Sequence, residues 1–581
     1  MRLSQTSLVS AMKSAQRIPF IVSILFLSIF LLPIVFLFAG SSYFQIGSST
    51  FTFQMFISIM TSSRTAGLLI NTLILALGAA LVATILGVVY AWITVRTDVP
   101  MKRLLELMPI LPLAMPFLVK AFSWIYLFSP RIGLVNYGLV QIFGSGAAVF
   151  SIYTMGGMIF AMGVGGLPLA YLTVEPAMKA MDPSLEEASR VAGNGIFKTI
   201  LKVTFPVLLP SILSAFLLLT IISLENFDYP LVLGSVGGIR TLSTEVYFWI
   251  NGSMPPKYGT AAIISIIFLI VTLSSVSIYI WVTRRAYKFV VVTGKATHGT
   301  VHNLRKWRYP AFLVCFGIFF FSFLLPFSTL VLMSFTSFFS TVGGNLVLTF
   351  VGLQNYVDAL NLPLIYNALI NTIGVALAAG LISTLLAAFL SYAALKSRLK
   401  GARLIEFIGS IPLAFPGVVY GLALFWTFLL LPGISDLIYG TIWPLVIALI
   451  FVRLPYSVRM VSGNLIQMSS ELEEASRVSG ASWIRTFVRI VLPLMKRGLI
   501  NSFTYTFVNS MRELGAIVIL VTSQSIVLTV LLLNLYASHP LALNTVAAAS
   551  VMLCLLIFVG LVIPPFVSRL SRLRKSRSRK T

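Results

Sequence analysis

The chain has 581 residues, of which 58% are hydrophobic and only 10% are charged, and its mean hydropathy is +0.98. Soluble domains carry roughly 25% charged residues, so this composition excludes a soluble globular protein. The formal net charge of +25 would suit a nucleic-acid partner, but the placement of the cations along the chain argues against one.

Long continuous apolar runs predict an all-α polytopic membrane protein with about twelve transmembrane helices. A helix of about 20 apolar residues crosses the hydrocarbon and satisfies its own backbone, whereas a membrane barrel would show short alternating segments. The predicted spans lie near residues 18–40, 66–94, 106–129, 149–172, 207–234, 258–283, 310–335, 367–395, 406–431, 438–460, 497–522 and 543–567.

The first predicted span, residues 18–40, follows Arg2, Lys13 and Arg17, as the core of a signal peptide would. It is too long for such a core and has no clear A-x-A cleavage site. It also has a counterpart at the start of the second half of the chain. We therefore expect this segment to be retained as a membrane span.

The basic residues follow the positive-inside pattern. With an even number of spans, most of the 41 Lys and Arg residues fall on the side that holds both termini, and the other side holds Arg64, Arg131, Arg240 and Lys257. This distribution predicts that both termini are cytoplasmic. The basic tail, residues 568–581, is interpreted as a contact with anionic membrane lipid, with RNA binding as the minor alternative.

The two halves of the chain are repeats. Asn71-Thr72 matches Asn371-Thr372 at an offset of 300 residues, and EEASRVAGNGIFKTILKVTFP at 186–206 matches EEASRVSGASWIRTFVRIVLP at 473–493. Six spans in each half predict two parallel repeats related by a pseudo-twofold axis along the membrane normal, with a pathway at their interface. The predicted domains are 1–283 and 310–567, joined by a basic cytoplasmic linker at 284–309 and followed by the tail at 568–581.

Paired prolines stand early in the third span of each half, at Pro112 and Pro116 and at Pro412 and Pro416. Proline removes a backbone donor, so each pair indicates either a broken helix that lines the pathway or a kink that serves packing. The sequence leaves both interpretations open.

The linker 284–309 contains His298 and His302. A metal site would need Cys or acidic partners close by, and the linker offers none, so both histidines are interpreted as plain linker residues.

Two polar loops, residues 182–206 and 469–493, are predicted to form a short helix, a turn and a second helix. Ser184 to Glu187 and Ser470 to Glu473 fit capping boxes. A glycine then ends each first helix, and the second helix is expected to end near Pro206 or Pro493. Small side chains would leave one face open to a partner protein, and the structural alternative is a loop that lies on the membrane surface. The glycines are Gly193 and Gly480, and the small pairs are Ala188-Ser189 and Ala475-Ser476.

The spacing in both loops resembles the EAA loop of binding-protein-dependent ABC importer permeases: E-A-A, three residues, G, nine residues, I-x-L-P. The second loop departs only at Ser476, and the first loop departs at Ser189 and reads Val203-Thr-Phe205-Pro206 at its end. The resemblance covers nearly the whole chain, which looks like two permease domains fused into one polypeptide.

This resemblance implies a bacterial inner-membrane permease that docks two copies of a cytoplasmic ABC ATPase subunit and receives substrate from a periplasmic binding protein. ATP and Mg would bind the ATPase, because this chain has no G-x-x-x-x-G-K-[ST] motif. The chain itself is therefore predicted to be a transport subunit with no cofactor and no enzymatic activity. The residues implied in ATPase coupling are Glu187, Ala188, Ser189, Gly193, Glu474, Ala475, Ser476 and Gly480.

Charged side chains inside spans usually face a pathway or a partner. At the offset of 287 residues, Glu225 aligns with Arg512 and Asn226 aligns with Glu513. One hypothesis pairs Glu225 with Arg512 near the axis, where they would close the pathway. In the alternative, each charge is satisfied within its own half or lies at the interface. The full set of candidate pathway residues is Glu225, Asp228, Tyr229, Arg512 and Glu513.

The stretches around residues 226–234, 255–259 and 512–515 resemble the ferric-iron members of the family, and carboxylate and phenol oxygens suit a hard cation. No metal ligands are assigned. Thiamine, polyamines and phosphonates stay as alternative substrates. A secondary transporter of the major facilitator type is the alternative from another class, although residues 96–103 do not fit its G-x-x-x-D-R-x-G-R-R signature.

Overall fold

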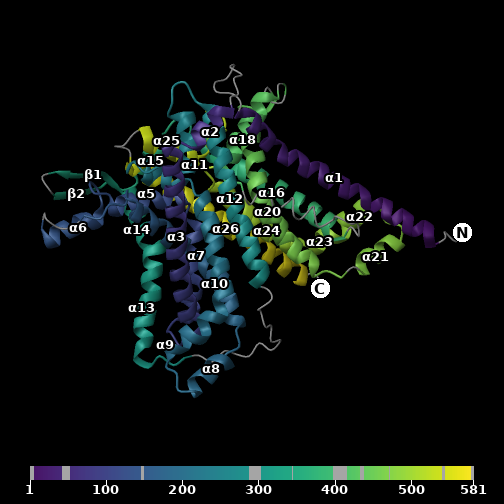
Figure 1. Cartoon of the computed structure of the whole chain (residues 1–581), viewed down its shortest axis with the longest axis horizontal. Helices are drawn as coiled ribbons and strands as arrows, with labels where there is room; N and C mark the ends of the chain where they lie inside the picture. Colours follow the sequence, from purple (N-terminus) through teal and green to yellow (C-terminus); the bar gives the residue numbers. More distant parts are fainter. Residues whose placement is uncertain are drawn as a thin grey trace.

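The computed structural model describes residues 5–41, 53–144, 149–286, 302–342, 345–396, 415–431, 433, 437–469, 471–538 and 543–577. In this part of the chain, helices make up nearly the whole fold (Figure 1). One antiparallel hairpin pairs its two strands with Thr336 opposite Phe350.

The elements of the first half are α1 (Gln5–Gly40), α2 (Phe53–Met60), α3 (Ser63–Arg96), α4 (Lys102–Leu107), η1 (Met108–Ala114), α5 (Phe117–Phe128), α6 (Leu134–Phe143), α7 (Met155–Ala180), α8 (Ser184–Val191), α9 (Ile196–Thr199), η2 (Ile200–Thr204), α10 (Phe205–Glu225), η3 (Pro230–Gly234), α11 (Leu242–Asn251) and α12 (Tyr258–Ala286).

The elements of the second half are η5 (Arg305–Trp307), α13 (Arg308–Phe319), η6 (Phe320–Leu324), α14 (Leu325–Ser334), β1 (Thr336–Val342), β2 (Asn345–Phe350), α15 (Gln354–Leu360), α16 (Ile365–Lys396), α18 (Gly417–Leu430), α20 (Trp443–Ile466), α21 (Glu471–Val478), α22 (Trp483–Thr486), η8 (Phe487–Val491), α23 (Leu492–Leu494), α24 (Lys496–Met511), α25 (Leu528–Ser538) and α26 (Leu543–Arg577).

The prediction of a multi-pass helical membrane protein is confirmed. Among the described residues, nine helical runs are long and apolar enough to cross a membrane, and a bent pair gives a tenth. The predicted span 406–431 lies partly outside the described residues. The predicted span 497–522 is interrupted instead, because α24 has 16 residues and ends at Met511. The structure therefore supports fewer full-length spans than the twelve predicted.

The bent pair lies at the first proline pair. Helical residues Lys102–Ala114 and α5 meet at an angle of 99°. Pro112 lies inside the 3-10 helix η1, and Pro116 takes an extended conformation at the start of α5. A residue before proline avoids the helical region, so Met115 is extended and the helix breaks there. The broken-helix interpretation is thus favoured over a packing kink in the first half. Pro412 lies outside the described residues, and Pro416 begins α18 as Pro116 begins α5.

The threonines of the two Asn-Thr pairs accept equivalent hydrogen bonds in the two halves. The Thr72 hydroxyl accepts the first backbone N–H of α11, from Leu242, at 2.9 Å, and the Thr372 hydroxyl accepts that of α25, from Leu528, at 2.8 Å. A helix begins with unpaired N–H groups, and in an apolar interior another element must satisfy them. Each threonine on a long span therefore fixes the start of a short helix that the sequence did not predict.

The first helix of each half packs on the other half. In Figure 1, α1 lies beside the helices of the second half, and α13 lies beside α3 of the first. Phe30 of α1 stacks on Phe451 of α20 with ring centroids 5.6 Å apart. In α13, Cys315 is buried in a cluster with Tyr90 and Tyr171 of the first half. The two halves are consequently braced across each other.

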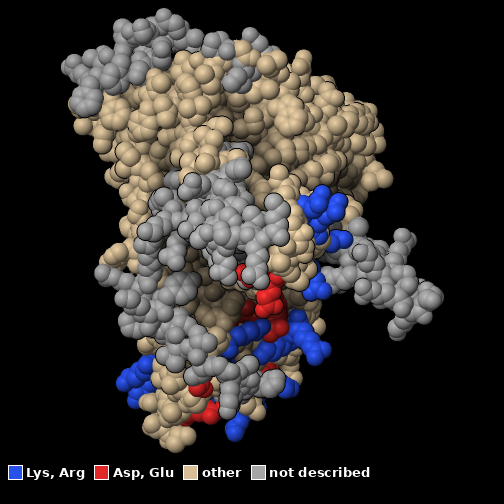
Figure 2. Space-filling model, turned by 90° about the vertical axis from the view of Figure 1, so that its right-hand side faces the viewer, with Lys and Arg blue, Asp and Glu red and all other residues tan. Residues whose placement is uncertain are grey.

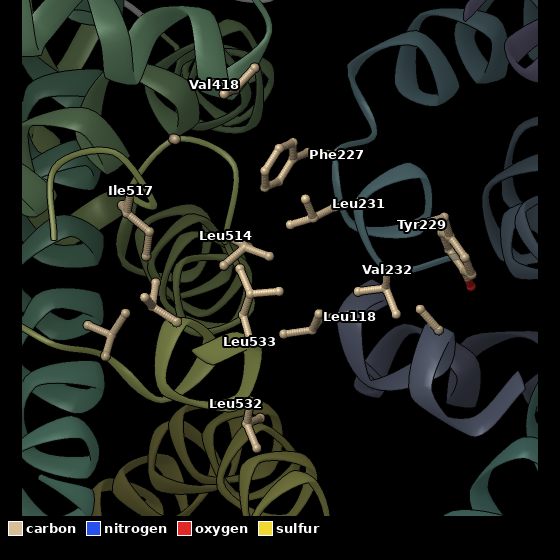
Figure 3. Close-up of a cluster of buried hydrophobic side chains, with 14 of the residues drawn as sticks. Leu118, Phe227, Tyr229, Leu231, Val232, Val418, Leu514, Ile517, Leu532 and Leu533 are labelled. Carbon is tan, nitrogen blue, oxygen red and sulfur yellow. The ribbon is translucent and has the colours of Figure 1, made fainter. Parts of the chain in front are cut away.

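A buried apolar cluster fills the interface of the two halves where α10 and α24 end. Figure 3 shows Phe227 and Leu231 of the first half pointing toward Leu514 and Leu533 of the second. All four side chains are at most 6% exposed. Burial of a large aliphatic or aromatic side chain stabilises by about 1.5–3 kcal/mol, so this cluster is a substantial part of the contact between halves.

Removal of the Thr72 or Thr372 hydroxyl tests the capping role. Thr72→Val and Thr372→Val each leave a buried N–H without its acceptor, and we expect each to lower the free energy of unfolding by about 1–3 kcal/mol. Unfolding of the purified protein in mixed micelles by a denaturing detergent measures this. Thr61→Val, at an exposed hydroxyl that bonds only within its own helix region, is the matched control. Equal effects at all three positions would contradict the capping role.

Candidate functional site

The two polar loops have the same structure. An eight-residue helix (α8, α21), a four-residue helix (α9, α22) and a wider π-helical turn (η2, η8) each recur at an offset of 287 residues. The predicted helix–turn–helix is confirmed. The predicted end of the second helix near Pro206 is wrong, because residues Ile196–Glu225 form one continuous helical run into the membrane. The π turn lets Phe205 N–H bond to Ile200 O, and it shifts the register just where proline lacks a donor.

The predicted capping box at the start of α8 is also wrong. Pro183 occupies the cap position, and Ser184 is the first helical residue with no side-chain cap. The Asp182 carboxylate accepts the Ser184 N–H instead, at 2.9 Å. Proline brings no N–H of its own, so the nearest acceptor before it takes the capping role. Ser470, the matching residue, lies outside the described residues.

The glycine stops are confirmed. Gly193 and Gly480 have φ values of +85° and +81°, a left-handed conformation that a side chain disfavours. The N–H groups that follow, of Asn194 and Ala481, bond back to the third motif residues, at Ser189 O and Ser476 O. These glycines end α8 and α21 and set the direction in which the next helix leaves.

The third motif residue does not present an open face to a partner, as the small pairs had suggested. The Ser189 hydroxyl lies 3.1 Å from the Thr199 hydroxyl, and the Ser476 hydroxyl lies 3.0 Å from the Thr486 hydroxyl. Each serine therefore joins the two short helices of its own loop. A serine fits this role better than alanine, because its hydroxyl can satisfy the threonine.

The outward surface of each loop is apolar at matching positions. The first and second motif residues, Glu187 and Ala188 in one loop and Glu474 and Ala475 in the other, are exposed. Around them stand large apolar side chains whose exposed fractions match between the loops. They are Leu185 (45%), Val191 (89%) and Phe197 (75%), and their equivalents Leu472 (54%), Val478 (88%) and Ile484 (64%).

The residue that anchors the first loop was missed by the sequence analysis. Glu186, one position before the motif, is fully buried. Its Oε1 accepts a hydrogen bond from the Thr204 hydroxyl at 2.6 Å, and its Oε2 lies 3.8 Å from Arg96 Nε and 3.3 Å from His302 Nε2. His302 is therefore not a plain linker residue, because 3% of it is exposed and it contacts the loop. His298 lies outside the described residues.

The second loop is anchored at the equivalent glutamate by a different partner. Glu473 is buried, and its Oε2 accepts a hydrogen bond from the Tyr392 hydroxyl at 3.1 Å. Thr204 is replaced by Val491 in this half, which cannot donate. The sequence held a signal for the buried role of Glu186. The capping-box prediction had assigned Glu187 and Glu473 as capping residues, whereas the three-residue spacing of neighbours on a helix places Glu186 on the inner face of α8.

The central segments do not join Glu225 to Arg512. Arg512 Nη1 donates to the Leu113 carbonyl at 2.7 Å, and its guanidinium lies 5.1 Å from the centre of the Phe117 ring. Leu113 lies in η1, next to the break of the first half's third span, where carbonyl groups lose their helical partners. The predicted direct pair is therefore wrong, and Arg512 instead crosses to the other half and satisfies its broken helix.

The ion pair of the central segments joins Glu513 to Arg453, a basic residue inside the predicted span 438–460 that the sequence analysis did not single out. Arg453 Nη2 contacts Glu513 Oε2 and also donates to the Asn509 carbonyl at 3.1 Å. The second Glu513 oxygen accepts the Ala516 N–H at 3.3 Å. The charge of Glu513 is thus satisfied within its own half, as the alternative interpretation held.

The remaining predicted pathway residues, Glu225, Asp228 and Tyr229, lie at the end of α10 and in the segment that follows it. Tyr229 is buried and points into the first half, away from Leu514 (Figure 3). Asp228 is 9% exposed, and its Oδ1, like Glu225 Oε1, has no hydrogen-bond partner among the described residues. Within the described part of the chain, no group of three His, Cys, Asp or Glu side chains could hold a metal ion.

Loss of the Arg453–Glu513 pair should be costly. Glu513→Gln removes the charge partner of Arg453, whose side chain is 12% exposed and keeps its hydrogen bond to the Asn509 carbonyl, and we expect a loss of about 1–3 kcal/mol in the free energy of unfolding. Glu225→Gln, which removes a carboxylate whose Oε1 has no partner, should be neutral or stabilising. Unfolding of both variants in mixed micelles compares them directly. The double change Glu225→Arg with Arg512→Glu should give no mutual rescue of transport.

The contribution of Glu186 to the stability of the folded state depends on pH. Burial alone would raise the pKa of its carboxyl, but the contacts with His302 and Thr204 and the charge of Arg96 outweigh burial and lower the pKa below its usual 4.5. The folded state therefore favours the carboxylate, and its stabilisation is complete above pH 4.5 and fades as the pH falls through the lowered value. Melting curves of the wild type and Glu186→Gln should converge below pH 4.5 and separate above it. Glu187→Gln, at an exposed neighbour, is the control, and a constant gap for Glu186→Gln at all pH values would contradict this.

Comparison with known proteins agrees with this architecture. Residues 83–288 and 383–572 each match the family described as binding-protein-dependent transport system inner membrane component. The putative ferric transport system permease protein FbpB 1 of Haemophilus influenzae is 30% identical over 82% of this chain and 73% of its own length. The ferric transport system permease protein FbpB of Actinobacillus pleuropneumoniae is 28% identical over 84% of this chain and 69% of its own length.

A solved structure of a bacterial ABC transporter involved in the import of the acidic polysaccharide alginate is 22% identical over 46% of this chain and 99% of the matched chain, with a TM-score of 0.36. The family matches together cover more than half of the sequence, one in each half. The chain therefore belongs to the family of binding-protein-dependent transport system inner membrane components, and it carries the family's domain twice in one polypeptide.

Proposed function

We propose that this chain is the transmembrane subunit of an ATP-driven importer. Two copies of a separate cytoplasmic ABC ATPase would dock on the loops at α8–α9 and α21–α22, with ATP and Mg bound on that partner. This chain would hold no cofactor and catalyse no reaction. A periplasmic binding protein would deliver the substrate to the opposite end. Membership in this family replaces the major-facilitator alternative.

The observation that carries the proposal is the matching outward surface of the two loops. Two loops in different halves expose apolar side chains at three equivalent positions and to nearly equal extents, as with Val191 (89%) and Val478 (88%). Exposed apolar groups of this size mark interaction sites, and two similar surfaces suit two identical partners arranged with twofold symmetry. A loop that merely lay on lipid would need no such agreement in backbone and side chains.

The cytoplasmic placement of the loops is supported by the distribution of charge. Figure 2 shows one face of the molecule, and Lys and Arg side chains gather on its lower part, toward the end where α8 lies in Figure 1. Basic side chains concentrate on the cytoplasmic side of membrane proteins. We assign that end, with both termini, to the cytoplasm, and the end with α2, α15 and the β hairpin to the periplasm.

We propose that the pathway runs between the halves, along a pseudo-twofold axis between them. The segments that follow α10 and α24 meet there through Phe227, Leu231, Leu514 and Leu533, which close the interface with apolar side chains (Figure 3). Asp228, Glu225 and the Arg453–Glu513 pair lie around this closure. Separation of the halves would expose these charges, and they, with Tyr229 and Arg512, remain the candidates for contact with substrate.

Ferric iron is the substrate we propose. Two relatives that span most of this chain carry ferric transport in their names. Carboxylate oxygens, such as those of Asp228 and Glu225, suit a hard cation in transit. Thiamine, polyamines and phosphonates are the other candidates, and a putative 2-aminoethylphosphonate permease of Salmonella typhi is 29% identical over 40% of this chain. Uptake of radioactive ferric iron by vesicles with the complete complex, against unlabelled competitors of each class, decides among them.

Charge placed on the loop surfaces tests the docking. Val191→Asp and Val478→Asp should each weaken ATPase binding more than tenfold, because a carboxylate cannot enter an apolar contact without losing its hydration. Affinity of the purified ATPase for nanodisc-held permease measures this. Leu353→Asp, at a 64% exposed apolar residue beside α15, is the matched control and should not change the affinity. Unaltered binding in both loop variants would remove the basis of the proposal.

A further inference from the structure

The end of the segment that joins the two halves lies against the first polar loop. Residues 302–304 lead directly into η5 and α13. The His302 N–H donates to the Arg96 carbonyl at 2.8 Å, the Asp98 N–H donates to the His302 carbonyl at 3.3 Å, and the Leu304 N–H donates to the Asp98 carboxylate at 2.8 Å. The segment is thereby paired with the cytoplasmic end of α3.

The His302 side chain connects this segment to α8 by both of its ring nitrogens. Nε2 lies 3.3 Å from Glu186 Oε2, and Nδ1 lies 3.3 Å from Arg190 Nη1. The ring packs on Trp92 with centroids 6.3 Å apart. An arginine can only donate, so this geometry fits a neutral ring with its proton on Nε2, facing the carboxylate. One side chain of the segment that leads into the second half thus contacts two residues of α8.

Arg96 adds a fixed support behind this contact. Its Nη2 donates to the Met178 and Met181 carbonyls, both at 3.0 Å, at the end of α7. Its Nε faces Glu186 at 3.8 Å. The loop is therefore held from the ends of α3 and α7, which are its own half, and from His302, which is not.

The segment is continuous with the core of the second half. From His302 the chain runs through α13, which packs on α3 of the first half, and through η6 into α14, which packs both on α26 of the second half and on α5 of the first. A displacement of the second half relative to the first would move this arm and pull on Glu186 and Arg190. In the other half, Phe20 of α1 packs against a buried cluster that includes Phe487, Val491 and Met495 beside the second loop.

We propose that His302 is a positioning residue through which the second half holds the first coupling helix, so that relative movement of the two halves is transmitted to the α8 docking surface. The contact is matched in the second loop by a support of its own half, the Tyr392–Glu473 hydrogen bond. The consequence for transport rests on the proposed function, whereas the holding of α8 by His302 does not.

Spin labels on the two docking helices test the holding directly in the permease alone. Val191→Cys and Val478→Cys place a label on α8 or on α21, at side chains that are 89% and 88% exposed. Cys315 and Cys554 are buried and stay in place, and the unsubstituted chain gives the background. His302→Ala should raise the mobility of the label at 191 at least twofold and leave the label at 478 unchanged. Tyr392→Phe should raise the mobility of the label at 478 and leave the label at 191 unchanged.

The controls separate positioning from general damage. Lys306→Ala changes an exposed residue of the same segment and should alter neither label. Thr204→Val makes the first loop resemble the second and should raise only the mobility at 191. Equal changes at both labels in His302→Ala, or no change at 191, overturn the proposal.

The assembled complex with its ATPase gives the functional measurement. In His302→Ala, the number of substrate molecules moved per ATP hydrolysed should fall severalfold, while the affinity for the ATPase stays within twofold of wild type. A role limited to folding would reduce the yield of complex and leave that ratio unchanged, and this outcome counts against the proposal. If the wild-type permease itself bound no ATPase, the proposed function would fail, while the label experiment would still decide the role of His302.

Discussion

The absence of water around the membrane-embedded backbone is the constraint on which the rest of this structure depends. A helix that breaks in such surroundings leaves amide and carbonyl groups that other parts of the chain must satisfy. The third span of the first half breaks at Met115, and Arg512 from the other half donates to the Leu113 carbonyl beside that break. Asn71 and Thr72 similarly satisfy the approach to α11, through the Arg240 carbonyl and the Leu242 N–H.

The same constraint explains why the breaks lie near the interface of the two halves. Irregular backbone at membrane depth is tolerated where it is buried in protein or lines a cavity. The segments after α10 and α24 find hydrogen-bond partners at this interface. The space between the two segments is filled by Phe227, Leu231 and Leu514.

Cross-bracing is the second principle of the architecture. The first helix of each half packs on the other half, and each of these chain segments contacts one of the two polar loops or the cluster beside it, through Phe20 in one case and His302 in the other. The polar contact is buried, and an unpaired Glu186 would carry a large desolvation cost, so the carboxylate keeps its partners. Both loops are therefore contacted by the chain outside their own half as well as by helices of their own half.

Sequence reasoning was most successful where the physics is local or repeated. The apolar runs, the duplication at offsets of 300 and 287 residues, the short loop helices and the glycine stops at Gly193 and Gly480 all follow from composition, periodicity and backbone preference. It failed where a neighbouring residue changed a local rule. Asp182 rather than Ser184 caps α8, because Pro183 has no N–H. The π turn allows the helix to continue past Pro206.

By itself, the sequence determined that this protein spans a membrane, that it is built twice from one plan, and that each half presents a polar loop of one shape. Tertiary structure alone decided that His302 reaches Glu186, that Glu513 pairs with Arg453, and that Arg512 satisfies the Leu113 carbonyl. Those choices join residues 60 to 399 positions apart. No local pattern encodes them, because they depend on how packed helices bring distant side chains within hydrogen-bond reach.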